Sequence, residues 1–306
     1  MKDNYKDNRK GLLLATTTAI LWGILAIALK VALNYFDSYT IVWSRFTIAF
    51  LVMIGYYVIV KPGRLSILWN PPLLLIIASI LLGINYIGFM EGIHYAGPGI
   101  TQVFIQTGPI VLGLVGFLFF KERLTWVRAA GFFIAGTGFI FFYYQQLSVI
   151  IENASIVNKG VLYVLMGASA WVGYAICNKL LVRTHQPLDL NLLFYGIPAI
   201  GFSFMADYTL FTNDYPWWVW LLLFFLGLNT VVAYGALSAA LKYAESNKIS
   251  IIIAVNPIIT FILLELMFYF NIFWFKIDPF STMAYVGAIL VLIGAVLAIG
   301  IFKKRY

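Results

Sequence analysis

Several ionisable side chains lie inside long apolar stretches of this sequence, and four of them are candidates for a role in function: Lys30, Arg45, Glu91 and Glu265. Placing such a side chain in hydrocarbon costs about 2.5–3.5 kcal/mol on insertion scales, so a charge at that depth indicates a functional site by default. The planar guanidinium of Arg45 suits a carboxylate. Glu91 suits a substrate ammonium or a coupling proton, because an acid at this depth can hold either.

Each of these charges also has a structural interpretation. Glu91 could extend its carboxylate to the outer membrane interface, and Lys30 could do the same with its ammonium. Arg45 could anchor its own helix or pair with Asp37. Glu265 could be a salt-bridge partner or a second proton site. The sequence leaves these alternatives open.

Two prolines, Pro109 and Pro257, interrupt apolar stretches. A proline removes one helical hydrogen bond and frees a backbone carbonyl, which a bilayer tolerates only against protein or a cavity. Polar residues precede both prolines, namely Gln102 and Gln106 before the first and Asn256 before the second. We therefore predict a polar substrate pocket between two broken helices.

Aromatic and amide side chains complete the predicted pocket. Rings can form its walls, although each ring would be equally ordinary as a packing residue. Asn85 and Asn229 lie near the middle of their stretches, where an amide either contacts substrate or ties two helices by a hydrogen bond. The predicted substrate-binding residues are Trp22, Asn85, Glu91, Gln106, Trp171, Tyr234 and Asn256.

No catalytic pattern accompanies these residues. The sequence has two histidines and one cysteine, and it lacks the zinc-protease, serine-hydrolase and phosphate-loop motifs. We therefore expect a protein that is not an enzyme and that needs no metal or cofactor. Any active transport would draw on a gradient instead of nucleotide hydrolysis.

The composition places these residues in a membrane. Hydrophobic residues make up 62% and charged residues 10% of the chain, against about 45–50% and about 25% in soluble domains. Nearly all lysines and arginines lie in the connections on one side of the membrane, so this side and both termini are predicted to be cytoplasmic. Because these basic clusters follow the pattern of topology signals and form no continuous stripe, no nucleic acid partner is expected. Stretches of spanning length fall at about 11–33, 39–60, 73–95, 99–120, 126–144, 160–182, 188–210, 217–240, 249–270 and 281–302.

The two halves of the chain resemble each other around a polar stretch at 145–159. Because each half holds five spans, the second half enters the membrane from the opposite side, which gives the inverted repeats typical of secondary transporters. We predict a first repeat at 1–148 and a second at 149–306. At an offset of about 149, Ala19, Trp22, Ala26, Ile27 and Lys30 correspond to Ala168, Trp171, Ala175, Ile176 and Lys179.

These motifs resemble the EamA branch of the drug/metabolite transporter superfamily over nearly the whole chain. Phe194 stands where a second arginine would match Arg45, which departs from strict symmetry. The resemblance implies ten membrane helices around a central cavity. It rests on Ala19-x-x-Trp22-Gly23, Arg45-Phe46, the segment from Pro109 to Glu122-Arg123-Leu124, Trp171, Ala233-Tyr234 and Pro257.

The sequence therefore predicts an all-α integral membrane protein with ten transmembrane helices, in the inner (plasma) membrane of a bacterium. Its predicted function is secondary active export of amino acids or similar small zwitterionic metabolites by alternating access, with protons as the candidate coupling ion. The alternative is a carrier or antiporter of nucleoside- or nucleotide-like metabolites such as S-adenosylmethionine, stacked on Trp22 or Trp171. A channel or a membrane-embedded enzyme is disfavoured.

Overall fold

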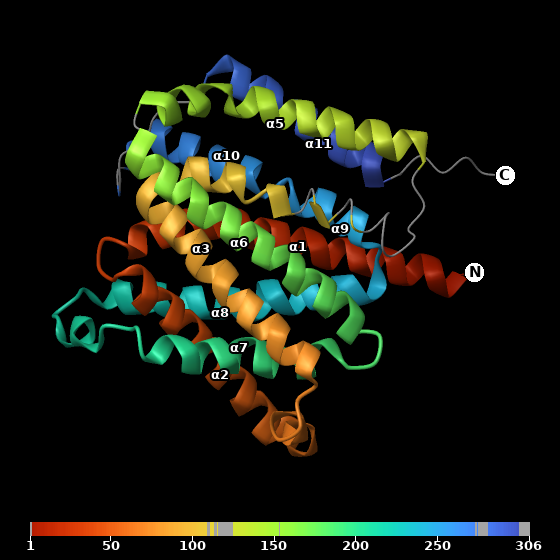
Figure 1. The fold of residues 1–306 in the computed structure, drawn as a ribbon, viewed down its shortest axis with the longest axis vertical. Helices are drawn as coiled ribbons and strands as arrows, with labels where there is room; N and C mark the ends of the chain where they lie inside the picture. Colours follow the sequence, from red (N-terminus) through yellow and green to blue (C-terminus); the bar gives the residue numbers. More distant parts are fainter. Residues whose placement is uncertain are drawn as a thin grey trace.

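The computed structural model describes residues 2–108, 111–112, 115, 125–152, 154–272, 274 and 281–299. All regular structure in these residues is helical (Figure 1). The first half contributes α1 (Lys2–Ala32), α2 (Ser38–Val60), the 3-10 helix η1 (Pro62–Leu68), α3 (Leu73–Phe104) and α5 (Trp126–Glu152). The second half contributes α6 (Ala154–Leu181), α7 (Pro187–Ser203), η2 (Tyr208–Thr212), α8 (Trp217–Tyr243), α9 (Ser246–Ile253), α10 (Asn256–Tyr269) and α11 (Thr282–Ile299).

Several helices are long and apolar enough to cross a bilayer. Large apolar side chains such as Ile59 and Phe133 are 82% and 77% exposed, which is the surface that lipid covers in a membrane. The protein is thus a multi-pass helical membrane protein. Among the described residues, six candidate spans qualify by length and hydropathy: Asn8–Ala32, Ser38–Val60, Leu73–Gln102, Lys159–Leu181, Trp217–Tyr243 and Lys248–Tyr269.

Helices from opposite halves of the chain pack against each other in pairs. Helix α3 packs along α6, α1 along α8, α2 along α7, and α5 along α11. Figure 1 shows α5 and α11 together at one edge of the molecule, with α2 at the opposite edge. The two halves are therefore interleaved and do not form separate lobes.

The α3–α6 contact depends on glycine. A Cβ atom placed on Gly88 would lie 2.6 Å from the carbonyl oxygen of Tyr163 and 2.8 Å from the Cα atom of Gly167. Without side chains at this point the two backbones meet directly, which is how membrane helices gain packing energy where no hydrophobic effect separates them from lipid.

Both halves contain an interrupted helix at an equivalent position. In the first half, Gly97 takes a positive φ of 78°, a conformation that glycine adopts without steric cost, and the chain turns again at residues 105–106. In the second half, α8 ends at Tyr243, and a turn at residues 254–255 separates α9 from α10. Pro257 lies in the first turn of α10, whereas Pro109 lies outside the described residues.

Three predicted boundaries are wrong. The stretch 145–159, expected as a linker, is helical on both sides of residue 153, because α5 continues to Glu152 and α6 starts at Ala154. Its polar residues include good helix formers, and a helix satisfies its own backbone outside the bilayer as well as inside. For the same reason α1 starts already at Lys2. Helix α7, in contrast, ends at Ser203, short of residue 210, and Asp207 caps the separate 3-10 helix η2.

The connections between helices gather at two ends of the molecule. The start of α1, η1, the α6–α7 turn and the α8–α9 junction lie toward one end, and the α1–α2 turn and η2 lie toward the other (Figure 1). At the first end, Arg64 pairs with Asp189 at 2.8 Å and Arg128 with Glu245 at 2.9 Å. The described ion pairs of the connections therefore share one end, and its assignment to the cytoplasmic face stays a prediction.

We expect Gly88→Ala to destabilise the protein by about 1–3 kcal/mol, because its methyl group overlaps the α6 backbone. The measurement is the Tm of the purified protein in detergent. Gly55→Ala is the matched control, because no atom lies within 4 Å of a Cβ at that helical position. An unchanged Tm for Gly88→Ala would show that the α3–α6 contact is looser than described.

Candidate functional site

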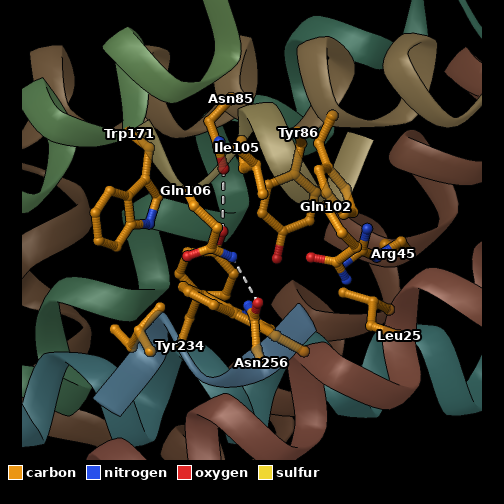
Figure 2. A pocket seen from close by; sticks show the side chains of 13 residues that line it. Leu25, Arg45, Asn85, Tyr86, Gln102, Ile105, Gln106, Trp171, Tyr234 and Asn256 are labelled. Carbon is orange, nitrogen blue, oxygen red and sulfur yellow. Dashed lines mark hydrogen bonds between the residues drawn. The ribbon is translucent and has the colours of Figure 1, made fainter. Parts of the chain in front are cut away.

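A small cavity lies between helices of the two halves (Figure 2). Its volume is about 50 Å³, which is room for a few water molecules. Residues singled out from the sequence meet on its wall, although their role in substrate binding stays a prediction. They are Trp22 from α1, Arg45 from α2, Asn85 from α3, Gln106 from the turn after α3, Trp171 from α6, Tyr234 from α8 and Asn256 from α10.

Aromatic rings form one wall of the cavity. The ring of Trp22 lies 6.1 Å from that of Trp171 and 5.2 Å from that of Tyr234. Tyr86 continues the wall, with its ring centroid 5.3 Å from Tyr234. These rings pack against one another, and their faces can attract a cation or an apolar group.

Arg45 is buried in the cavity wall, with only 2% of its surface exposed. Its Nε donates to the Thr230 hydroxyl at 3.3 Å, and its guanidinium carbon lies 4.3 Å from the centroid of the Tyr86 ring. Its two terminal nitrogens have no acceptor among the described residues, and no described carboxylate forms an ion pair with it. The charge is therefore buried without an anion in the described part of the chain.

The alternative pairing of Arg45 with Asp37 is not formed. Asp37 instead caps the N-terminus of α2, where its carboxylate accepts hydrogen bonds from the backbone N–H groups of Tyr39 and Thr40 at 2.8 and 3.1 Å. A buried cation without a counter-ion is destabilising. A bound anion is the natural group to compensate this charge.

Two amide side chains present oxygen atoms to the cavity. Gln102 donates from Nε2 to the Thr260 hydroxyl at 3.1 Å, and Gln106 donates from Nε2 to Oδ1 of Asn256 at 2.7 Å. The Oε1 atoms of both glutamines are buried without a partner among the described residues, as is the indole N–H of Trp171. The wall therefore offers acceptors and donors to a ligand.

Asn85 and Asn229 tie helices together. Asn85 donates to the carbonyl of Gly167 at 3.1 Å and accepts from the Tyr234 hydroxyl at 3.1 Å. Asn229 donates to the carbonyl of Leu21 at 3.1 Å. All three hydrogen bonds join opposite halves of the chain. This agrees with the alternative in which the two asparagines tie helices together. Asn85 also lines the cavity, so its contact with substrate stays a prediction.

Glu91 is buried, with 7% of its surface exposed, but it is not on the cavity wall. It is close enough to Tyr39 and Lys159 to interact with them electrostatically. Contact between this carboxylate and a substrate ammonium therefore has no geometric support in this conformation. A role in proton coupling stays a prediction.

The other predicted charges also lie off the cavity wall. Lys30 is in the last turn of α1. Glu265 is on α10, close enough to Tyr285 of α11 for electrostatic interaction. Pro257 shapes the start of α10 but does not reach the cavity.

Sequence reasoning missed part of the wall. Tyr86 was identifiable in principle, because it directly follows Asn85 in a polar interruption of an apolar stretch. The aliphatic residues carry no such signal, since their types are the same as those of lipid-facing and packing residues. The missed residues are Leu25, Tyr86, Phe89, Ile105 and Ile253.

The spanning helices, the break repeated in both halves and the cavity between them are the features expected of a membrane transporter. The EamA-like transporter family matches residues 9–144 and again residues 158–300, and the chain belongs to this family. The resemblance found in the sequence is thus confirmed, and each match covers one predicted repeat.

Similar proteins carry transporter names. An "Uncharacterized transporter" of Haemophilus influenzae is 30% identical over 290 residues, covering 94% of both chains. The "Uncharacterized inner membrane transporter YhbE" of Escherichia coli K12 is 30% identical over 292 residues, covering 93% of this chain and 89% of that one. A solved structure described as "Crystal structure of protein" shares the fold, with a TM-score of 0.76 at 17% identity over 97% of this chain and 100% of that one.

We expect Arg45→Met to raise the Tm of the ligand-free protein, because the substitution removes a buried charge that has no described counter-ion. Arg64→Met is the control. It breaks a paired arginine and should lower the Tm or leave it unchanged. A fall in the Tm of Arg45→Met would show that the charge of Arg45 is already compensated.

Proposed function

We propose that this protein is a secondary active carrier that exports amino acids or similar small zwitterionic metabolites across a bacterial inner membrane. It has ten spans, both termini are cytoplasmic, and transport proceeds by alternating access. One observation carries the proposal: the guanidinium of Arg45 is buried in the wall of a cavity without an anion among the described residues. A substrate carboxylate supplies that anion.

A zwitterion fits the cavity at both of its charged ends. Its carboxylate can accept two hydrogen bonds from the terminal nitrogens of Arg45, the geometry in which arginine binds carboxylates most strongly. Its ammonium can lie against the faces of Trp22 and Tyr234 and the unpaired amide oxygens. An apolar side chain can pack on Leu25 or Ile253.

The size of the cavity favours a small substrate. Its volume of about 50 Å³ is far below the roughly 300–1,000 Å³ of pockets for drug-sized ligands. A nucleoside-like substrate would gain stacking on Trp22 and Trp171, but it would need a much larger expansion of the site. The small zwitterion therefore remains the preferred substrate.

The interrupted helices support alternating access. The turns at 105–106 and 254–255 both adjoin the cavity, since Ile105, Gln106, Ile253 and Asn256 line it. Short irregular segments of this kind absorb the changes in φ and ψ that a hinge requires. With inverted repeats at 1–148 and 149–306, the two segments can exchange roles as the cavity opens to either side.

The test is counterflow in proteoliposomes preloaded with each of the twenty amino acids, with S-adenosylmethionine and nucleosides in parallel. We expect amino acid counterflow in the wild type and a loss of about 100-fold or more in Arg45→Met, because two charge-assisted hydrogen bonds are removed. Lys61→Met is the control, because Lys61 is an exposed cation remote from the cavity. Full counterflow by Arg45→Met would refute the role of Arg45.

We further propose that Glu91 carries the coupling proton. Because Glu91 is off the cavity wall, Glu91→Gln should abolish transport driven by a pH gradient and preserve both counterflow and the Tm. Glu265→Gln serves as the matched variant, since it also removes an acid from a membrane helix. Normal gradient-driven transport by Glu91→Gln across a range of pH would assign Glu91 a structural role at the membrane interface.

A further inference from the structure

Two glutamines of the cavity wall each carry an unpaired amide oxygen. Gln102 and Gln106 are 1% and 2% exposed, and the Oε1 atom of each is buried without a partner among the described residues. Both residues line the cavity. Because an unpaired buried carbonyl costs free energy, a ligand that donates hydrogen bonds here would gain more than one that only fills space.

The orientation of the Gln102 amide is fixed by α10. Its Nε2 donates to Oγ1 of Thr260 at 3.1 Å, and the Thr260 hydroxyl donates to the carbonyl of Gly23 at 2.7 Å. A hydroxyl has one hydrogen, so Thr260 can only accept from Gln102. The amide must therefore turn its nitrogen toward Thr260 and its oxygen away from it.

The Gln106 amide pairs with a second amide. Its Nε2 donates to Oδ1 of Asn256 at 2.7 Å, which leaves its Oε1 unpaired. Asn256 and Thr260 are one turn apart on α10. One helix of the second half thus contacts two amides of the first half, and Figure 2 shows Gln106 between Trp171 and Arg45 in the cavity.

We propose that the Oε1 atoms of Gln102 and Gln106 form the ammonium site of the carrier and select substrates by their N–H groups. Primary and secondary ammonium groups are accepted, and quaternary ammonium groups are rejected. This inference rests on the proposed function, in which Arg45 binds the carboxylate. It assigns the residues that bind the ammonium group of the substrate, and it narrows the substrate class to amino acids whose ammonium group retains N–H donors.

The amide oxygens, and not the aromatic rings, set this preference. The faces of Trp22 and Tyr234 attract a cation whether or not it carries hydrogens. A trimethylammonium group would leave both amide oxygens buried and unpaired, and sites built to hydrogen-bond a substrate N–H discriminate strongly against analogues that lack it. Thr260 does not line the cavity and acts as a positioning residue for Gln102.

The experiment uses the wild-type protein and a methylation series: glycine, sarcosine, N,N-dimethylglycine and glycine betaine, with the alanine series in parallel. Each compound competes with counterflow of labelled glycine or alanine, and its stabilisation of the purified protein is measured as a Tm shift. Two acceptors need two N–H groups, so glycine and sarcosine should bind comparably. N,N-dimethylglycine should bind more weakly, and betaine weaker still by about tenfold or more.

Two results would overturn the inference while leaving the proposed function intact. Betaine could bind as well as glycine, or affinity could fall equally with every methyl group, which would indicate a limit of size alone. Absence of binding and counterflow for all twenty amino acids would overturn the proposed function and this inference together. The outcomes are therefore distinguishable.

Variants of Thr260 test the positioning role. Thr260→Val cannot accept from Gln102, so the ratio of glycine to betaine affinity should fall about tenfold, whereas Thr260→Ser should retain the wild-type ratio. Thr47→Val is the control, because Thr47 has a buried hydroxyl outside the cavity. If Thr260→Val kept the wild-type ratio of glycine to betaine affinity, the positioning role would be refuted. The methylation series itself uses the wild-type protein and so does not depend on the folding of any variant.

Discussion

The site of this transporter is organised around one buried positive charge. Arg45 is held by a hydroxyl on one side and by the face of Tyr86 on the other, and neither contact neutralises it. A charge at this depth is tolerated only because a surrounding protein keeps it from lipid. The buried position of Arg45 thus depends on the packing of helices from both halves around the cavity. Its lack of a described counter-ion leaves a place for a substrate carboxylate.

The helix breaks connect this charge to the rest of the fold. A continuous helix would satisfy its own backbone and turn only side chains toward the cavity. The turns at 105–106 and 254–255 lie next to polar residues from both halves, and these residues meet at the cavity. The pair of Gln106 with Asn256 is one product of this arrangement, because each half supplies one partner.

The sequence predicted the fold through features with strong physical constraints. Long apolar stretches can only be membrane helices, and the cost of buried charges pointed to Arg45. The same reasoning placed Trp22, Trp171 and Asn256 together, because prolines and polar residues recur at matched positions. It could not separate Glu91 from the cavity, since membrane depth does not reveal which side of a helix faces inward. It also missed the helical extensions of α5 and α6, where polarity marks the end of the bilayer but not the end of the helix.

The pairing of helices across the two halves has a consequence for biogenesis. Helix α3 ends at Phe104, but its partner α6 is complete only at Leu181, and the partner of α1 is complete only at Tyr243. At about 5–20 residues per second of synthesis, α3 waits roughly 4–15 s and α1 roughly 10–40 s for a native neighbour. During that time the face around Gly88 is without α6, and Arg45 is without its hydrogen bond to Thr230 of the second half. The first half therefore depends on lipid, on the insertion machinery or on a chaperone until the second half has been made.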